Sequence, residues 1–160
     1  MKNSSMFSAK KFCRLSQGKD SLDAHEPVPA GILFLVVLAC MAVSFPATCS
    51  LQITEFMAVN DTNIIDDDDD RSDWIEIYNP TKYPVNLQGW YLTNDADDLT
   101  KWGFPDMSLG SKGYLIVFAS EKNRPVLGAP IHTNFRLSNR GYLGLVSPAL
   151  IPVSEFFPEY

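Results

Sequence analysis

The chain has 160 residues and a formal net charge of −6, which allows one domain and a non-globular segment. Residues 1–50 carry five Lys/Arg against three Asp/Glu, a net of +2, and residues 51–160 carry eight against sixteen, a net of −8. An acidic domain of this kind repels phosphate backbones, so the composition argues against nonspecific nucleic-acid binding.

The N-terminal part divides into a polar leader and an apolar run. Residues 1–27 are polar and basic without periodicity, which predicts a disordered leader. Residues 28–47 carry no charge, and their continuous apolar run of about 16 residues suits a signal-peptide core better than a bilayer span, which takes about 20. We therefore predict an N-terminal hydrophobic helix over 28–50, either a cleaved signal peptide or a retained membrane anchor. A buried core helix is the remaining alternative.

The charges around this run predict its orientation. Lys and Arg precede it and acidic residues follow it, which places the N-terminus in the cytoplasm and the following domain outside. The small residues Ala47-Thr48-Cys49-Ser50 suit cleavage just before Leu51. The predicted location is therefore secreted or membrane-anchored, with membrane contact through the N-terminal segment if it stays uncleaved.

Residues 51–160 read as a β-domain without cysteine, because Cys13, Cys40 and Cys49 all precede it. A disulfide or thiolate metal site within this domain is therefore excluded. Short alternating or apolar segments recur every 8–12 residues or so, with no helical period, which predicts an antiparallel β-sandwich. The predicted strands cover 51–59, 73–79, 85–92, 99–104, 114–119, 131–137, 142–146 and 153–157. Gly89 is expected at a bulge or a close backbone approach.

Five consecutive aspartates, Asp66 to Asp70, open what we call the acidic loop, residues 66–73. Such a run repels itself and predicts an exposed loop. Calcium takes six to eight oxygen ligands, and the alternating carboxylates, with one from the next strand, could supply them. The candidate calcium ligands are Asp66, Asp68, Asp70, Asp73 and Glu76. The alternative is a solvated loop that binds no ion, in a domain without a cofactor. Asp69 favours this alternative, because it stands where the sharp turn of a calcium loop prefers glycine.

Catalytic chemistry has little support in the sequence. The β-domain has one histidine, His132, and no nucleophile-elbow motif, so we expect a buried or hydrogen-bonded structural histidine. The three tryptophans, Trp74, Trp90 and Trp102, are expected in the core or at its edge rather than on a sugar-binding platform. We predict that the domain is not an enzyme.

Several motifs, in order, resemble the lamin tail domain family, in its bacterial extracellular branch. They are Asp73-Trp-Ile-Glu-Ile-Tyr-Asn79, Leu87-x-Gly-Trp-Tyr-Leu92, Lys101-Trp-x-Phe-Pro105, Gly113-Tyr-Leu-Ile-Val-Phe118 and His132-Thr-Asn-Phe-x-Leu-Ser138. The resemblance covers about residues 51–157 and implies an immunoglobulin-like antiparallel β-sandwich that acts as an interaction module.

The function that the resemblance implies is a non-catalytic binding or structural module at the cell surface. Its partner would be a protein or a cell-surface polymer, and no nucleic acid is expected. Two alternatives stay open: an accessory domain of a larger extracellular hydrolase that is truncated here, and a calcium-dependent adhesion module. Family members usually continue beyond a position equivalent to Tyr160, which is the basis for expecting a truncated chain.

Overall fold

The computed structural model describes residues 5–8, 50–157 and 160, and these residues contain strands, turns and loops but no helix. Accordingly, the described part of the chain offers no helix that could span a membrane. The predicted hydrophobic helix over 28–50 lies outside the described residues except for Ser50. The strands are β1 (Ser5–Ser8), β2 (Gln52–Ala58), β3 (Asp73–Tyr78), β4 (Val85–Asn86), β5 (Tyr91–Thr93), β6 (Trp102–Gly103), β7 (Ser108–Leu109), β8 (Tyr114–Ala119), β9 (Ile131–His132), β10 (Leu143–Val146) and β11 (Pro152–Phe156).

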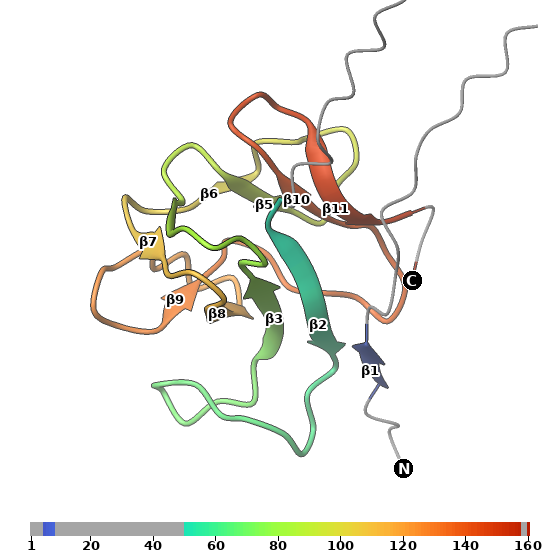
Figure 1. Ribbon diagram of the computed structural model, residues 1–160. Helices are drawn as coiled ribbons and strands as arrows, with labels where there is room; N and C mark the ends of the chain where they lie inside the picture. The colour runs from blue at the N-terminus through green and yellow to red at the C-terminus, as the bar shows by residue number, and fades with distance from the viewer. Residues whose placement is uncertain (1–4, 9–49, 158–159) are drawn as a thin grey trace, which may run out of the picture. The chain divides into compact units, whose positions relative to one another are not determined.

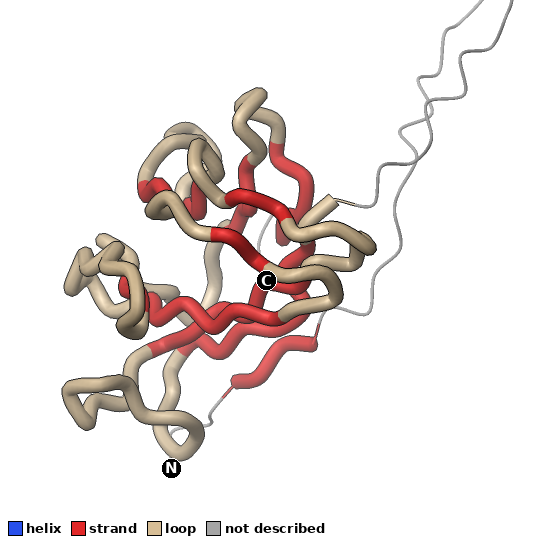
Figure 2. The backbone as a smooth tube through the Cα atoms, turned by 60° about the vertical axis from the view of Figure 1, so that its left-hand side comes forward, coloured by secondary structure: helices blue, strands red, loops and turns tan. Residues whose placement is uncertain are grey.

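The strands form two main sheets and a small third one (Figures 1 and 2). The larger sheet has the order β1-β2-β3-β8-β9, the second has the order β11-β10-β5-β6, and β4 pairs with β7 alone. All described pairings are antiparallel except β8 with β9, which run parallel. The all-β prediction is confirmed for the described residues, and the antiparallel prediction is wrong for the β8–β9 pair.

One hydrophobic core joins the two main sheets. In β3, Ile75 and Ile77 point into this core and are fully buried, while Trp74 points to the opposite face of the sheet. That period of two is the one that the sequence predicted for residues 73–79. On the opposite face, Trp74 joins Met57 and Phe118 in a second, smaller buried cluster. Trp74 and Trp102 are 5% and 3% exposed, so both tryptophans are buried apolar groups.

The segment 85–92, predicted as one strand, is instead two strands in different sheets. The chain turns between them: the Gln88 N–H donates to Asn86 Oδ1 at 2.8 Å and the Trp90 N–H donates to the Leu87 carbonyl at 3.0 Å. Gly89 adopts a φ of 78°, which glycine tolerates without strain, so it serves this turn. Gly89 thus lies in a turn between β4 and β5 and not at the predicted bulge. The space where a Cβ would stand borders the Pro148 side chain at 3.6 Å, so the predicted close approach of another backbone is not found there.

Two other predicted strands are shorter than expected. Only Trp102–Gly103 is a strand within 99–104, and only Ile131–His132 within 131–137. In the second segment the Thr133 hydroxyl donates to the Phe135 carbonyl at 2.6 Å and accepts from the Phe135 N–H at 3.3 Å. Local bonds of this kind compete with a sheet ladder and end the strand. Phe135 and Leu137 still reach the core, which explains why the apolar pattern continued past the strand.

The end of β3 is held by Asn79, whose side chain is fully buried. Its Nδ2 donates to three carbonyls, those of Tyr83, Leu109 and Gly110, at 2.9, 3.0 and 2.9 Å. Its Oδ1 accepts from the Thr81 N–H at 3.0 Å. One amide thus satisfies four backbone groups around the β3 end and the β7–β8 turn, which gives the last residue of the Asp73–Asn79 motif a physical role.

Candidate functional site

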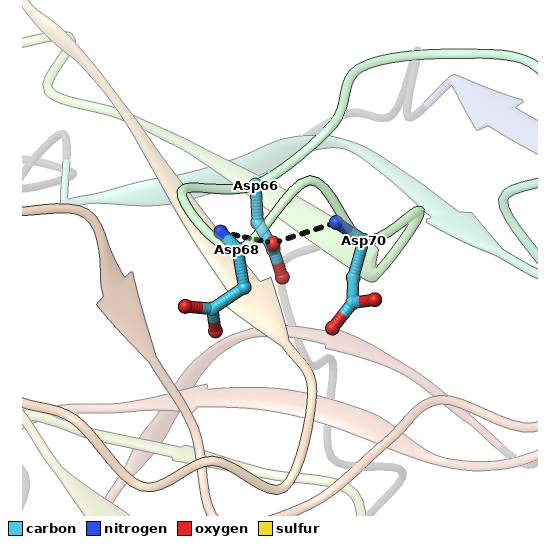
Figure 3. A group of neighbouring side chains, drawn as sticks. All are labelled: Asp66, Asp68 and Asp70. Atoms are coloured by element: carbon cyan, nitrogen blue, oxygen red, sulfur yellow. Dashed lines mark hydrogen bonds between the residues drawn. The ribbon is translucent and has the colours of Figure 1, made fainter.

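The acidic loop is folded around its first aspartate. Asp66 Oδ1 accepts the N–H groups of Asp68 at 2.9 Å and Asp70 at 3.1 Å, as Figure 3 shows. Its Oδ2 accepts the Ser72 hydroxyl at 2.7 Å, and its side chain is 0% exposed. The prediction of an exposed loop is therefore wrong for Asp66, because the turn needs a buried acceptor at its centre, whereas Asp67 to Asp70 are exposed.

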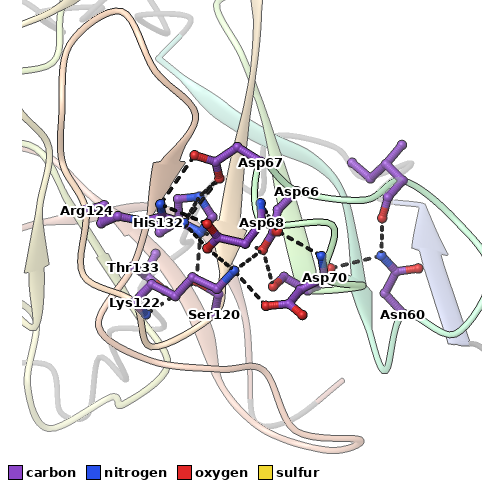
Figure 4. A network of polar contacts seen from close by, with 12 residues as sticks. Asn60, Asp66, Asp67, Asp68, Asp70, Ser120, Lys122, Arg124, His132 and Thr133 are labelled. Carbon is purple, nitrogen blue, oxygen red and sulfur yellow. Dashed lines mark hydrogen bonds and ion pairs between the residues drawn. The ribbon is translucent and has the colours of Figure 1, made fainter.

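A lysine from the segment after β8 lies among three of the predicted metal ligands. Lys122 Nζ lies 2.7, 2.6 and 2.9 Å from carboxylate oxygens of Asp66, Asp68 and Asp70. Those three side chains offer ligand atoms within 4.8 Å of one another. The ammonium group therefore stands where the carboxylates converge, in the position that a cation would take (Figure 4).

The second anchor of the loop is His132 in β9, whose side chain is 0% exposed. Its Nε2 lies 2.7 Å from Asp67 Oδ1 and its Nδ1 lies 2.8 Å from the Ser120 hydroxyl. Arg124 pairs with Asp67 and Asp68 through its guanidinium, so it lies over the same corner (Figure 4). This confirms that His132 is a buried, hydrogen-bonded residue.

The other two predicted ligands have different partners. Asp73 Oδ1 accepts the N–H groups of Val59 at 2.8 Å and Asn60 at 3.3 Å, and so holds the turn that follows β2. Glu76 Oε1 accepts the Thr54 hydroxyl at 2.7 Å across the β2–β3 pair. The structure thus brings together Asp66, Asp68 and Asp70 of the five, and calcium binding by the set stays a prediction.

The electrostatics of the loop follow from these contacts. Burial alone would raise the pKa of Asp66, but the hydrogen bonds from Lys122, Ser72 and two backbone N–H groups hold its pKa well below the ordinary 3.8. Burial would lower the pKa of Lys122, yet hydrogen bonds to the three aspartates raise it above 10.5. Both groups are therefore charged over the whole physiological range.

We expect the free energy of unfolding to fall as the pH drops below about 4. A carboxyl group with a lowered pKa stabilises the fold above its unfolded pKa of 3.8, and that stabilisation is lost as pH falls toward the folded pKa. Lys122 adds no acid dependence, because its raised pKa gives full stabilisation below 10.5. Urea unfolding at neutral and acidic pH measures the effect. An Asp66→Asn variant should show a shallower pH dependence, and an equally steep one would contradict the assignment to Asp66.

Asp69 adopts a φ of 61°, the left-handed region where the sequence pattern prefers glycine. Replacing Asp69 by Gly removes that strain and one charge from a crowded acidic run, against the larger backbone entropy of glycine in the unfolded chain. We expect Asp69→Gly to raise the free energy of unfolding by about 0.5 kcal/mol. Thermal melting measures this, and a lower melting temperature would contradict it. Asp61→Gly, at an exposed loop position without a positive φ, is the matched control and should not stabilise.

Ser120, His132 and Asp67 form a Ser–His–Asp chain, but the neighbouring groups do not complete a nucleophilic site. Ser120 is 3% exposed. The N–H groups of the two residues after it would be natural oxyanion donors, yet Glu121 N–H donates to the Phe135 carbonyl and Lys122 N–H to Ser120 Oγ, at 3.3 and 3.4 Å. These three residues therefore form a structural hydrogen-bond network that fixes His132 under the acidic loop.

Sequence reasoning missed Lys122 and Arg124 as partners of the acidic loop. They lie 56 positions beyond Asp66 and Asp68, respectively. The available signal was a pair of cations at alternate positions just after the apolar strand 114–119. That spacing places both side chains on one side of an extended segment, but it does not indicate which acidic group they meet.

The family model for the lamin tail domain matches residues 45–146, more than half of the chain. A search of curated proteins finds no match to the chain.

Proposed function

Because the chain belongs to the lamin tail domain family, we propose that residues 51–160 act as a binding or structural module displayed outside the cytoplasm. The family supplies an immunoglobulin-like fold without catalytic machinery. One observation supports a non-catalytic role for the domain: in the acidic-loop network, Lys122, Arg124 and His132 pair with the aspartates. These charged groups are thus engaged in internal contacts, which supports a structural role for the network.

The extracytoplasmic location is supported by the charge-free segment 28–47 and by the basic residues that precede it. A phosphatase that is active only after export, fused after Tyr160, tests this in bacterial cells. We expect phosphatase activity with the full chain and none after deletion of residues 28–47. Activity of a cytoplasm-specific reporter at the same position would contradict the proposal.

The partner that this module fits is a protein or a cell-surface polymer rather than a nucleic acid. Residues 51–160 have eight Lys/Arg against sixteen Asp/Glu, and two of those cations, Lys122 and Arg124, already pair with the acidic loop. Of the other six, Lys101 and Arg136 also pair with carboxylates, so the domain has no surplus of cations for phosphate contacts. Retention of the chain on duplex DNA at physiological salt, measured by fluorescence anisotropy, would overturn this part of the proposal.

Calcium-dependent adhesion is the second candidate, and one observation favours it: Asp66, Asp68 and Asp70 converge within ligand distance of one another. A calcium ion at this point would have to displace Lys122 Nζ, which is already bonded to all three. Binding would then move the Lys122 ammonium group into solvent and break its three short ion pairs with the aspartates.

A further inference from the structure

Two turns are held together where β3 ends and β8 begins. Residues 79–84 follow β3 and residues 110–113 precede β8, and we call them the paired turns. The fully buried Asn79 side chain donates to a carbonyl in each turn. The Ser111 hydroxyl of the second turn also donates to the Thr81 carbonyl of the first, at 3.0 Å. The backbone of the paired turns is therefore preorganised, which lowers the entropic cost of binding a ligand there.

Three tyrosines lie on or beside the paired turns. Tyr78 and Tyr114 are opposite each other on β3 and β8, and their rings stack with centroids 4.5 Å apart. Tyr78 is half-buried, Tyr114 is 60% exposed, and Tyr83 in the first turn is 64% exposed. The stack holds the Tyr114 ring in place and leaves part of its surface open. Rigid, exposed aromatic rings with a polar hydroxyl are typical of interaction surfaces.

The charge of the paired turns is opposite to that of the domain as a whole. Residues 77–94 and 107–120 contain Lys82 and Lys112 but no Asp or Glu. Both lysines are exposed, and among the described residues neither forms an ion pair with a carboxylate. Lys82 Nζ lies 5.4 Å from the centroid of the Tyr83 ring, and Lys112 Nζ donates to a backbone carbonyl of the first turn. Two cations thus lie beside exposed aromatic rings, which is complementary to an anion that has flat rings.

We propose that the paired turns bind an acidic polysaccharide, a polymer of carboxylated sugar rings, through a tyrosine–lysine site made of Tyr78, Tyr83, Tyr114, Lys82 and Lys112. The sugar rings pack their C–H faces on the exposed tyrosine rings, because both surfaces are apolar. The sugar carboxylates pair with the ammonium groups of the two lysines. This inference names the partner of the binding module proposed above, and it rests on that function.

An acidic polysaccharide fits this site better than other anionic polymers do. A nucleic acid brings a dense row of phosphates to a domain with eight Lys/Arg against sixteen Asp/Glu, and two lysines do not offset that repulsion. An acidic peptide has no ring face for the tyrosines. A polyuronate has one carboxylate on each ring and apolar ring faces between them. Glu76, which precedes Tyr78 by two residues on β3, already accepts the Thr54 hydroxyl.

The first experiment measures binding of the full-length chain, in mild detergent, to polygalacturonic acid by isothermal titration calorimetry. We expect binding that weakens as the salt concentration rises from about 50 to about 500 mM, because salt screens exposed charges. Fully methyl-esterified polygalacturonate keeps the rings and lacks the charges, and we expect it to bind about tenfold more weakly. No binding of polygalacturonic acid, or equal binding of its ester, would overturn the proposal.

Variants of the chain test the residues of the site. We expect Tyr114→Ala to weaken binding about tenfold, as truncation of a central interface aromatic does, and Tyr114→Phe to retain most of it because the ring stays. Lys112→Gln should weaken binding about threefold and reduce its salt dependence, and it carries the test if thermal melting shows that Tyr114→Ala does not fold. Phe157→Ala, which removes a 67% exposed ring outside the site, is the matched control. Equal binding by all these variants would contradict the site.

Competition identifies the class of polymer. We expect neither polyglutamate nor single-stranded poly(dT) to displace polygalacturonic acid at equal charge concentration. Displacement by polyglutamate would make the partner an acidic peptide, and displacement by poly(dT) would make it a nucleic acid, so either result would overturn the proposal. Failure of these binding experiments leaves the extracytoplasmic location to the phosphatase fusion. Polysaccharide binding by a chain whose fusion stays inactive would overturn the location and not the site.

Discussion

Replacing Lys122 by Met is expected to lower the free energy of unfolding by about 3 kcal/mol. The Asp66 side chain is 0% exposed, and Lys122 Nζ lies 2.7 Å from its carboxylate oxygen Oδ2. Removing one member of a buried ion pair leaves an uncompensated buried charge, which is costly. The N–H groups of Asp68 and Asp70 and the Ser72 hydroxyl still bind that carboxylate. The expected loss of stability is therefore at the lower end of the about 3–5 kcal/mol that breaking a buried ion pair costs. Urea unfolding followed by tryptophan fluorescence measures it.

The matched control is Lys82→Met, which removes an exposed lysine that lies over the Tyr83 ring at 5.4 Å. Exposed cation–π pairs contribute at most about 1 kcal/mol, so we expect a loss below about 1 kcal/mol. In the double variant Asp66→Asn/Lys122→Met the buried charge is absent, and part of the stability should return. A loss for Lys122→Met no larger than that of Lys82→Met would show that the lysine is only a surface ion pair.

Replacing Asn79 by Ala is expected to lower the free energy of unfolding by about 3 kcal/mol as well. The substitution removes the Asn79 side-chain bonds to the carbonyls of Tyr83, Leu109 and Gly110 and to the N–H of Thr81. The Tyr83 carbonyl keeps the Thr81 hydroxyl and the Gly110 carbonyl keeps the Gly113 N–H, so the Leu109 carbonyl and the Thr81 N–H carry most of the loss. Each buried polar group that loses its hydrogen bond costs about 1–3 kcal/mol, reduced where water or a local shift can replace the bond. The same urea unfolding experiment measures the loss.

Asn134→Ala is the control for Asn79. Asn134 is exposed, and its Nδ2 donates one hydrogen bond, to the Lys101 carbonyl at 2.8 Å. We expect this variant to lose less than about 1 kcal/mol. Equal losses at the two positions would mean that the four contacts of Asn79 do not hold the β3 end together, and the physical reading of the Asp73–Asn79 motif would fail.

The β-strands that the sequence predicts well are those whose residues alternate between the two faces of the sheet or form a continuous apolar run. Residues 73–78 and 114–119 form strands within a residue of their predicted bounds, because side-chain period and core burial agree there. The segment 85–92 fails for a local reason. Its apolar residues continue across a turn made by Asn86, Leu87 and Gly89, and a pattern of apolar residues does not reveal that turn.

The candidate site was predictable only in part. The sequence indicates that Asp66, Asp68 and Asp70 can converge, because the side chains of alternate residues in a tight loop can point to the same side. In the structure the carboxylates of these three residues do converge. It does not indicate that Asp66 is buried or that Lys122 lies among the three, because both facts depend on how the segment after β8 passes over the loop. Spacing within a loop is local information, whereas the choice between a metal ion and a lysine is made by tertiary contacts.

The most direct test of this account is a calcium titration of the full-length chain, kept in mild detergent and followed by thermal melting. The central claim is that Lys122 serves as the cation of the acidic loop, which makes the loop a structural element. We expect the same melting temperature with and without millimolar calcium. A calcium-dependent rise would contradict it, because a ligand that binds the native state must stabilise that state by mass action.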